Sequence, residues 1–266
     1  MRFGYCLNLQ FLKGDETSLS IFDAVCESGF DYLELPMFSL MELNSGEFLQ
    51  LKKKLADKGA VCRATNVFFP QVLPIVGPEK DISKAKDYID KALALAADLG
   101  VETIVFGNGG ARRVGEGMSH EGVWSDLREL AEIMDDFAGK NGVNVVIEPL
   151  NQKETNMIVS YTEAVKLVEG LKHVCAMCDW YHVQTDRQTL DDLLEYPNML
   201  GHLHIAYGAG RLIPSPDDDM ALYDEFIKAV KKLGYNNKLS IEGGFRGTEP
   251  TAVEIGKSLE ALKKMF

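Results

Sequence analysis

Short apolar runs alternate with longer amphipathic stretches along the whole sequence, and this alternation constrains the fold more than any other feature. Helical periodicity is strongest in residues 81–99, 121–140, 162–171, 220–233 and 252–265. The short runs have the length and composition of buried strands, and they span residues 2–6, 32–35, 61–66, 103–107, 144–148, 174–179, 200–206 and 238–242. Eight consecutive strand–helix units without a linker predict an α/β fold, a (β/α)₈ barrel that forms a single domain over residues 1–266.

An open, doubly wound sheet is the alternative arrangement of the same units. No Gly-x-Gly-x-x-Gly follows any predicted strand, which counts against a dinucleotide-binding sheet. The predicted loops before the strands are short, whereas three loops after strands are long, at residues 67–80, 108–120 and 207–219. Because catalytic residues of such a barrel come from the loops after the strands, we expect the functional site at that rim.

Four predicted strands in the second half of the chain end in a residue that can bind a metal ion. Glu148, Asp179, His204 and Glu242 follow apolar residues at the ends of the fifth to eighth strands. A single glutamate after a strand is more often a solvated loop residue or a helix N-cap. On consecutive parallel strands, however, three carboxylates and one imidazole emerge at one rim and form a pocket for a divalent cation. We therefore predict a metal site formed by these four residues.

Three further motifs allow both a structural and a functional interpretation. His202 lies two residues before His204 and faces the same side of the strand at greater depth, so we interpret it as a core or supporting histidine. Cys175 and Cys178 form a C-x-x-C motif inside a strand with no second pair, which favours core cysteines. The Gly-rich run 108–113 lacks the Lys-Ser/Thr ending of a phosphate-binding loop, which favours a structural turn at the mouth of the site.

Composition restricts the partners that such a chain can have. The net charge of −12 and the pI of about 4.9 disfavour nucleic acid, because phosphate binding needs clustered Lys and Arg. Five cysteines, an odd number, favour a reduced cytoplasmic setting over a disulfide framework. Residues 1–6 lack the pattern of a signal peptide, and no apolar run approaches the ~20 residues that span a bilayer. We expect a cytoplasmic protein that binds a small molecule and neither nucleic acid nor membrane.

The motifs around the predicted ligands resemble those of the sugar isomerase/epimerase superfamily of xylose-isomerase-like TIM barrels. They are most similar to the ketose 3-epimerase and hydroxypyruvate-isomerase-like branch. The resemblance rests on residues 147–156 (Ile-Glu-Pro-Leu-Asn-Gln-Lys-Glu-Thr-Asn), 178–182 (Cys-Asp-Trp-Tyr-His), 202–206 (His-Leu-His-Ile-Ala) with Arg211, and 240–242 (Ser-Ile-Glu). Close relatives often read His-Ile-Ala-Glu-Pro-x-Gly-Arg, and this chain departs from them with Tyr207-Gly208 where Glu-Pro is usual.

This resemblance implies a single (β/α)₈ TIM barrel and a role for each matching residue. In the family, one divalent metal ion (Mn²⁺, Co²⁺ or Mg²⁺, with Zn²⁺ as a further option) is bound by the residues that match Glu148, Asp179, His204 and Glu242. The two glutamates of this set are also the catalytic residues, and they act on opposite faces of the substrate. Substrate oxygens near the carbonyl are contacted by the residues that match Glu154, His182 and Arg211.

The reaction that we favour is 3-epimerisation of a free ketose. A metal bound to the carbonyl and a neighbouring oxygen stabilises the enediolate that forms when the adjacent C–H loses its proton. One glutamate takes that proton and the other returns one from the opposite face. Return to the neighbouring carbon would instead give aldose–ketose isomerisation of the hydroxypyruvate type.

Other activities of the superfamily are alternatives. Some branches dehydrate inososes, and others cleave DNA with three zinc ions, which requires more histidines than the five present and a basic groove. Non-catalytic sugar binding is a minority alternative. The substrate is the expected partner, and assembly into a homo-oligomer, a dimer or tetramer, is compatible with the sequence.

A Gly-rich run after Glu242, residues 243–247 with Arg246, could cradle a phosphate group. The acidic chain, the carboxylates at the same rim and the three aspartates 217–219 weigh against a phosphate. We therefore expect an unphosphorylated sugar or a sugar-like hydroxyketone.

Overall fold

Eight parallel strands close into a barrel in the computed structural model, which describes residues 1–208 and 210–266. Each strand pairs with the next along the chain, and β8 closes the barrel against β1, with Arg2 opposite Lys238. The strands are β1 (Arg2–Cys6), β2 (Tyr32–Pro36), β3 (Cys62–Asn66), β4 (Thr103–Phe106), β5 (Asn144–Ile147), β6 (Val174–Asp179), β7 (Leu200–Ile205) and β8 (Lys238–Ile241). This closed topology confirms the predicted (β/α)₈ barrel and excludes the open doubly wound sheet.

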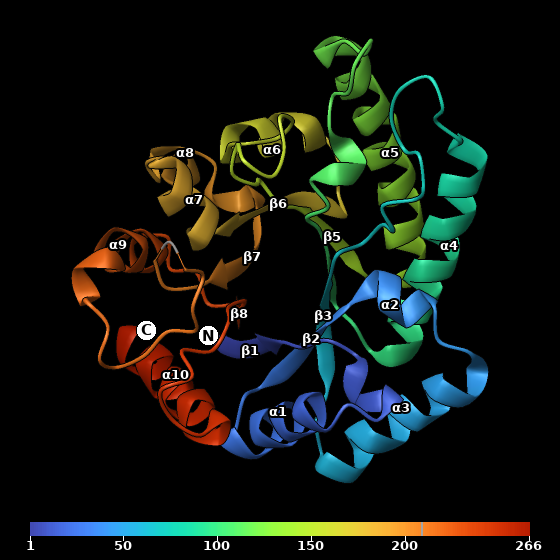
Figure 1. The fold of residues 1–266 in the computed structure, drawn as a ribbon. Helices are drawn as coiled ribbons and strands as arrows, with labels where there is room; N and C mark the ends of the chain where they lie inside the picture. The colour runs from blue at the N-terminus through green and yellow to red at the C-terminus, as the bar shows by residue number, and fades with distance from the viewer. Residues whose placement is uncertain (209) are drawn as a thin grey trace.

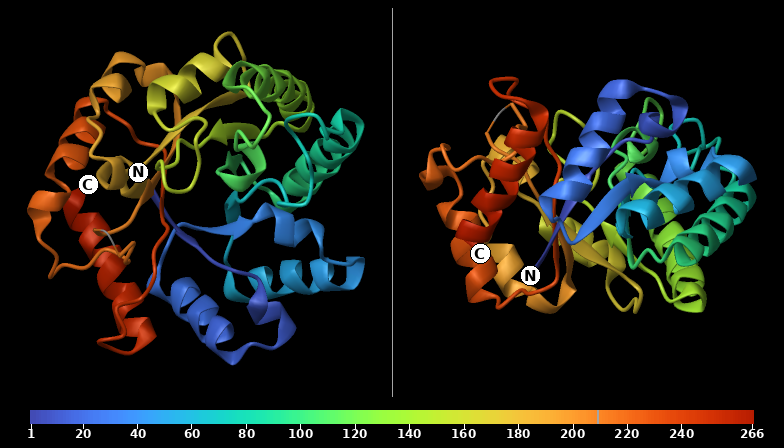
Figure 2. Two further views of the ribbon diagram at one scale, coloured as in Figure 1. Left: turned by 45° about the horizontal axis from the view of Figure 1, so that its top comes forward. Right: turned by 90° about the horizontal axis from the view of Figure 1, so that it is seen from below.

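Helices form an outer ring around the barrel (Figure 1), and the two ends of the chain lie near each other in all views (Figure 2). The α-helices are α1 (Glu16–Ser28), α2 (Met37–Met41), α3 (Ser45–Lys58), α4 (Ile82–Leu99), α5 (His120–Asn141), α6 (Tyr161–Val168), α7 (Trp180–Asp186), α8 (Asp191–Glu195), α9 (Asp224–Lys232) and α10 (Thr251–Met265). Short 3₁₀ turns are η1 (Gln10–Lys13), η2 (Gly110–Arg112), η3 (Pro197–Met199) and η4 (Met220–Leu222). None of the described helices is both long and apolar enough to cross a membrane.

Local sequence signals explain where several helices begin and end. Asn44 and Glu47 form a capping box at the start of α3, in which each side chain accepts from the backbone N–H of the other. Gly29 and Gly100 end α1 and α4 with φ of 87° and 81°, a conformation that glycine adopts without strain. The predicted helix 220–233 is divided at Tyr223, a buried residue whose hydroxyl donates to the Asp218 carboxylate at 2.9 Å.

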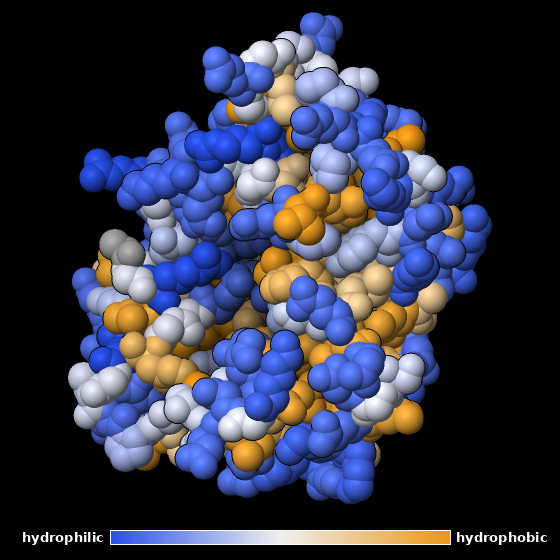
Figure 3. Space-filling view, turned by 45° about the vertical axis from the view of Figure 1, so that its right-hand side comes forward, coloured by the Kyte–Doolittle hydropathy of each residue, from blue (hydrophilic) through white to orange (hydrophobic). Residues whose placement is uncertain are grey.

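The end of the barrel where the strands begin is closed by ion pairs. Glu102 accepts from Arg2 Nη2 at 2.8 Å and from Lys238 Nζ at 2.9 Å, and the Lys238 side chain is almost fully buried. The opposite end of the barrel, where the strands finish, therefore remains available for a site. One face of the molecule is hollowed near its middle, with hydrophilic and hydrophobic residues side by side around the hollow (Figure 3).

Candidate metal and active site

The four predicted metal ligands converge at the carboxyl ends of β5 to β8. One ligand atom from each of Glu148, Asp179, His204 and Glu242 lies within 4.8 Å of the others. Glu148 and Glu242 directly follow β5 and β8, while Asp179 ends β6 and pairs in register with His204 on β7. Three of the four side chains are buried, and that of Glu242 is partly exposed. The sequence-based placement of these residues at one rim therefore agrees with the geometry.

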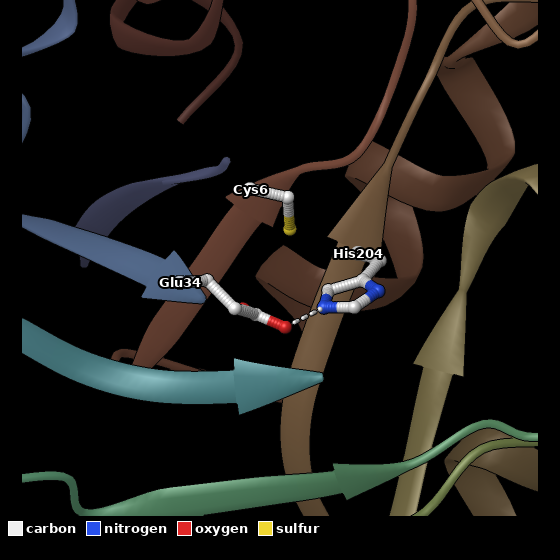
Figure 4. A group of neighbouring side chains, drawn as sticks. All are labelled: Cys6, Glu34 and His204. Atoms are coloured by element: carbon white, nitrogen blue, oxygen red, sulfur yellow. Dashed lines mark hydrogen bonds and ion pairs between the residues drawn. The ribbon is translucent and has the colours of Figure 1, made fainter. Parts of the chain in front are cut away.

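The orientation of His204 is set by Glu34, a residue that the sequence analysis did not single out. His204 Nε2 lies 2.8 Å from Glu34 Oε1, so the ring donates its Nε2–H to this carboxylate (Figure 4). Nδ1 then presents a lone pair toward the pocket, 2.9 Å from Glu242 Oε2 and 3.7 Å from Glu148 Oε1. A nitrogen lone pair and carboxylate oxygens at such distances repel one another, and either a proton on Nδ1 or a metal ion among these atoms relieves the repulsion.

Unpartnered buried atoms provide an independent test of whether a metal ion fits. Glu148 Oε1, His182 Nε2 and His204 Nδ1 have no hydrogen-bond partner among the described residues, and all three are buried. His182 Nε2 and His204 Nδ1 lie 3.6 Å and 3.7 Å from the same Oε1 of Glu148. Buried polar atoms without partners are costly, so their convergence marks a place for a ligand. Three carboxylates and one imidazole fit a divalent cation such as Mn²⁺ or Mg²⁺.

A second group of metal-ligating side chains, Cys6, Glu34 and His204, lies beside the first (Figure 4). Glu34 is completely buried, and its carboxylate accepts from His202 Nε2 at 2.9 Å and from the Ser240 hydroxyl at 2.5 Å, in addition to His204. Both carboxylate oxygens are thus satisfied by hydrogen bonds. We interpret this group as a network that orients His204, and His202 has the supporting position expected from the sequence. A charged residue inside the apolar run of β2 was the available signal for Glu34.

Arg211 is the positive charge closest to the carboxylates. Its Nη2 donates to Asp179 Oδ2 at 3.0 Å and to Glu242 Oε2 at 2.7 Å, and its guanidinium lies over the Tyr181 ring. Its φ of 47° is unusual for a residue with a side chain, so the backbone is strained where this arginine enters the site. Burial would raise the pKa of Glu242, but the positive charges of Arg211 and of the protonated form of His204 outweigh burial and lower this pKa. Burial raises the pKa of Asp179.

His182 and Glu154, predicted to bind substrate, lie at the same rim and are linked by Asn151. The Asn151 backbone N–H donates to His182 Nδ1 at 3.2 Å, so the proton of the neutral ring is on Nε2. This Nε2 lies 3.4 Å from Asp179 Oδ2 and faces the pocket. Asn151 Nδ2 donates to Glu154 Oε1 at 2.8 Å, and the Glu154 side chain is exposed. The structure therefore brings all seven predicted site residues together, and their individual roles stay predictions.

Two residues of the loop after β4 shape the position of Glu148. A Cβ added to Gly107 would lie 1.7 Å from Glu148 Oε2, so this carboxylate occupies the space left by the missing side chain. Arg112 is fully buried and donates to the backbone carbonyls of Phe106 and Glu148. Burial lowers the pKa of Arg112 to about 10. The Gly-rich run is thus a structural turn that supports Glu148, as the sequence suggested.

The chain matches one protein family over most of its length. The family described as "Xylose isomerase-like TIM barrel" matches residues 22–265. The protein belongs to this family.

The curated relatives are sugar epimerases. D-psicose 3-epimerase of Agrobacterium fabrum is 23% identical over 231 residues, which cover 83% of this chain and 77% of that protein. The 3-dehydro-D-guloside 4-epimerase of Escherichia coli is 30% identical over 133 residues, or 47% of each protein. The solved structure of 3-keto-D-glucoside 4-epimerase from E. coli shares the fold, with a TM-score of 0.78 at 22% identity over 99% of both chains. These relatives confirm the expected enzyme class, an isomerase acting on carbohydrates.

Proposed function

We propose that the protein is a metal-dependent epimerase that inverts C3 of a free ketose. The observation that carries this proposal is the pair of carboxylates Glu148 and Glu242, which reach one small pocket from β5 and β8. The two strands are not neighbours in the barrel, so the carboxylates approach a bound substrate from different sides. This geometry suits removal of a proton from one face of a carbon and its return to the other face.

The two glutamates have different surroundings, which supports a division of labour. Glu148 is buried and its Oε1 has no hydrogen-bond partner among the described residues, so this oxygen is available to take or give a proton. Glu242 is partly exposed and its Oε2 accepts from Arg211. The arginine holds this carboxylate ionised and fixes its direction.

Glu148, Asp179, His204 and Glu242 would hold the metal ion, and Mn²⁺ is the ion that we favour over Co²⁺ and Mg²⁺. When bound, a divalent cation polarises the carbonyl of the substrate and makes the adjacent C–H more acidic. Around it, His182 presents an Nε2–H that can donate to a substrate oxygen, because Asn151 occupies its Nδ1. Arg211 adds a charged donor, and the exposed Glu154 can accept a hydrogen bond from a substrate hydroxyl.

The loop after β8 supports an unphosphorylated substrate. Backbone N–H groups that could bind a phosphate are occupied by the Glu254 carboxylate of α10, which accepts from Arg246 at 2.9 Å, Thr248 at 2.9 Å and Glu249 at 3.2 Å. The Arg246 guanidinium donates to the Asp218 carboxylate. A phosphate at this loop would have to displace one carboxylate and lie beside another, which is unfavourable.

The free cysteines and the net charge support the proposed location and partners. All five cysteines are free, which suits a reducing compartment, and we propose the cytoplasm. We propose a neutral sugar as the substrate and no nucleic-acid partner, in keeping with a net charge of −12. Assembly into a homo-oligomer remains compatible with this proposal.

The proposed function is tested by incubating the full-length protein with MnCl₂ and a panel of free ketoses. We expect each good substrate to equilibrate with its C3 epimer on chromatography. A chelator should abolish this conversion, and added Mn²⁺ should restore it. Formation of aldoses instead would identify an isomerase, and no conversion of any ketose would contradict the proposal. The corresponding ketose phosphates should be poorer substrates than the free sugars.

A further inference from the structure

Asn66 ends β3, and its side chain is buried in the wall of a cleft of about 530 Å³ that opens where the strands finish. Arg211 and Glu242 line the same cleft. Asn66 Nδ2 donates to Glu242 Oε1 at 3.4 Å, the only hydrogen bond of this side chain among the described residues. An ionised carboxylate can only accept, so the amide nitrogen rather than the amide oxygen faces Glu242. The contact therefore joins β3 to a predicted catalytic glutamate through a residue that the sequence analysis did not single out.

The two carboxylate oxygens of Glu242 have different partners. Oε2 accepts from Arg211 Nη2 at 2.7 Å and lies 2.9 Å from His204 Nδ1, so this oxygen faces the predicted metal position. Oε1 faces the Asn66 amide instead. The main chain of Glu242 is also fixed, because Arg211 Nε donates to its carbonyl at 3.2 Å. With Oε2 engaged on the metal side, Oε1 is the oxygen left to exchange a proton with a substrate carbon, and the Asn66 amide holds it.

The backbone next to Asn66 is held in a strained conformation. Val67 has a φ of 46°, which is an outlier for a β-branched residue. Its carbonyl accepts from the Phe38 backbone N–H at 3.2 Å. Further along the same loop, the buried Asn108 side chain donates to the Phe69 carbonyl at 2.6 Å and accepts from the Phe69 N–H at 3.1 Å. Such strain persists only where the surrounding structure enforces it, and it clusters at functional sites. These contacts fix the position of the Asn66 amide.

We infer that Asn66 is a positioning residue for proton transfer, because its amide directs Glu242 Oε1 toward the reacting carbon of the substrate. The inference rests on the proposed epimerase function and adds to it a residue that acts through Glu242. Catalytic hydrogen bonds are often long before the substrate binds, so the separation of 3.4 Å is compatible with this role. A misplacement of about 1 Å in such a site can cost about 100-fold in rate, which makes a residue that only orients a carboxylate important.

The first part of the test separates orientation of Glu242 from metal binding. Asn66→Leu keeps the size of the side chain and removes the donor, so we expect kcat for the best free ketose to fall by about tenfold or more. Calorimetric Mn²⁺ affinity should stay within about threefold of the wild type, because Arg211 still holds Oε2, in contrast to the roughly 10- to 100-fold loss typical of removing a support for a metal ligand. Asn66→Gln, which keeps an amide in a roomy cleft, should recover most of kcat. Gln50→Leu, the same kind of change at an exposed residue of α3, is the control that should leave kcat unchanged.

The second part uses isotope effects, which a general structural defect would not shift in opposite directions. The ketose and its C3 epimer, each deuterated at C3, are converted in opposite directions, and Glu242 removes the proton in one direction and returns one in the other. Asn66→Leu should slow only the step of Glu242. The primary isotope effect on kcat/KM should therefore rise in the direction in which Glu242 removes the proton and fall in the other direction. Gly107→Ala, which displaces Glu148, should shift both isotope effects the opposite way. Asn66→Ser, too short to reach Glu242, should behave like Asn66→Leu and provides a second variant.

The outcomes separate this inference from the function on which it rests. Epimerisation by the wild type, with isotope effects that stay unchanged or move the same way in both directions in Asn66→Leu and Asn66→Ser, would overturn the inference and leave the epimerase proposal intact. A wild-type kcat in both variants would overturn it as well. No conversion of any free ketose by the wild type would contradict the proposed function together with the inference.

Discussion

Glu34 Oε1 lies 2.8 Å from His204 Nε2, and both side chains are fully buried. The contact joins the middle of β2 to β7 across the interior of the barrel. Because an ionised carboxylate can only accept hydrogen bonds, Glu34 fixes the His204 ring with Nε2–H toward itself and Nδ1 toward the predicted metal position. The Ser240 hydroxyl, which bonds to the Tyr32 hydroxyl at 2.8 Å, secures Glu34 in turn.

The first prediction concerns this contact. Glu34→Gln places an amide N–H among the histidines and no longer enforces the ring orientation of His204. We expect Mn²⁺ binding to weaken about 10- to 100-fold in calorimetric titration, the usual effect of removing a residue that supports a ligand. Glu116→Gln, at an exposed loop residue, is the matched control. Equal affinity of Glu34→Gln and the control would show that Glu34 does not orient the ligand.

The second prediction concerns Gly107. An alanine Cβ would meet Glu148 Oε2 at 1.7 Å, so Gly107→Ala must displace this carboxylate. We expect at least about tenfold weaker Mn²⁺ binding and a similar loss of epimerisation. Gly256→Ala is the control, because its Cβ would meet no atom within 4 Å. Normal metal affinity in Gly107→Ala would mean that Glu148 does not bind the metal in the observed conformation.

The third prediction concerns metal removal. A ligand at 100 times its Kd stabilises the folded state by about 2.7 kcal/mol, so a chelator should lower the unfolding temperature of the metal-loaded protein. Asp179→Asn should be insensitive to the chelator, because it loses a ligand charge while an asparagine can still cap α7. The measurement is calorimetric unfolding with and without Mn²⁺. The same chelator-induced shift in both proteins would place the metal elsewhere.

The fourth prediction concerns acid stability at the closed end of the barrel. Arg2 and Lys238 hold the pKa of Glu102 at about 2, below its ordinary value of 4.5. The unfolded chain therefore binds this proton more tightly, and the stability contributed by Glu102 is present above pH 4.5 and lost as the pH falls toward 2. Urea unfolding of Glu102→Gln should show a shallower loss of stability over this interval than the wild type. Identical pH dependence of the two proteins would contradict the pairing of Glu102 with Arg2 and Lys238.

The sequence was sufficient to predict the barrel and to predict which residues lie at its rim. The strands from β4 onward carry distinct apolar runs, and Glu148, Asp179 and Glu242 stand where such runs end, which local pattern reveals. The residues that support the predicted ligands are not evident from local sequence, because their importance comes from contacts between distant segments. Glu34 meets His204 from 170 positions away, and the steric requirement at Gly107 appears only when Glu148 is placed beside it. Periodicity and motif spacing contain no information on such contacts.

The central claim is that a proton is exchanged at the carbon next to the carbonyl of an intact ketose. It is tested most directly by incubating the manganese-loaded protein with its best free ketose in D₂O and locating deuterium by NMR. We predict deuterium at C3 in both epimers, and none when Glu148→Gln replaces the wild type. Deuterium at C1 or C2 without label at C3, or conversion without any deuterium, would contradict the account.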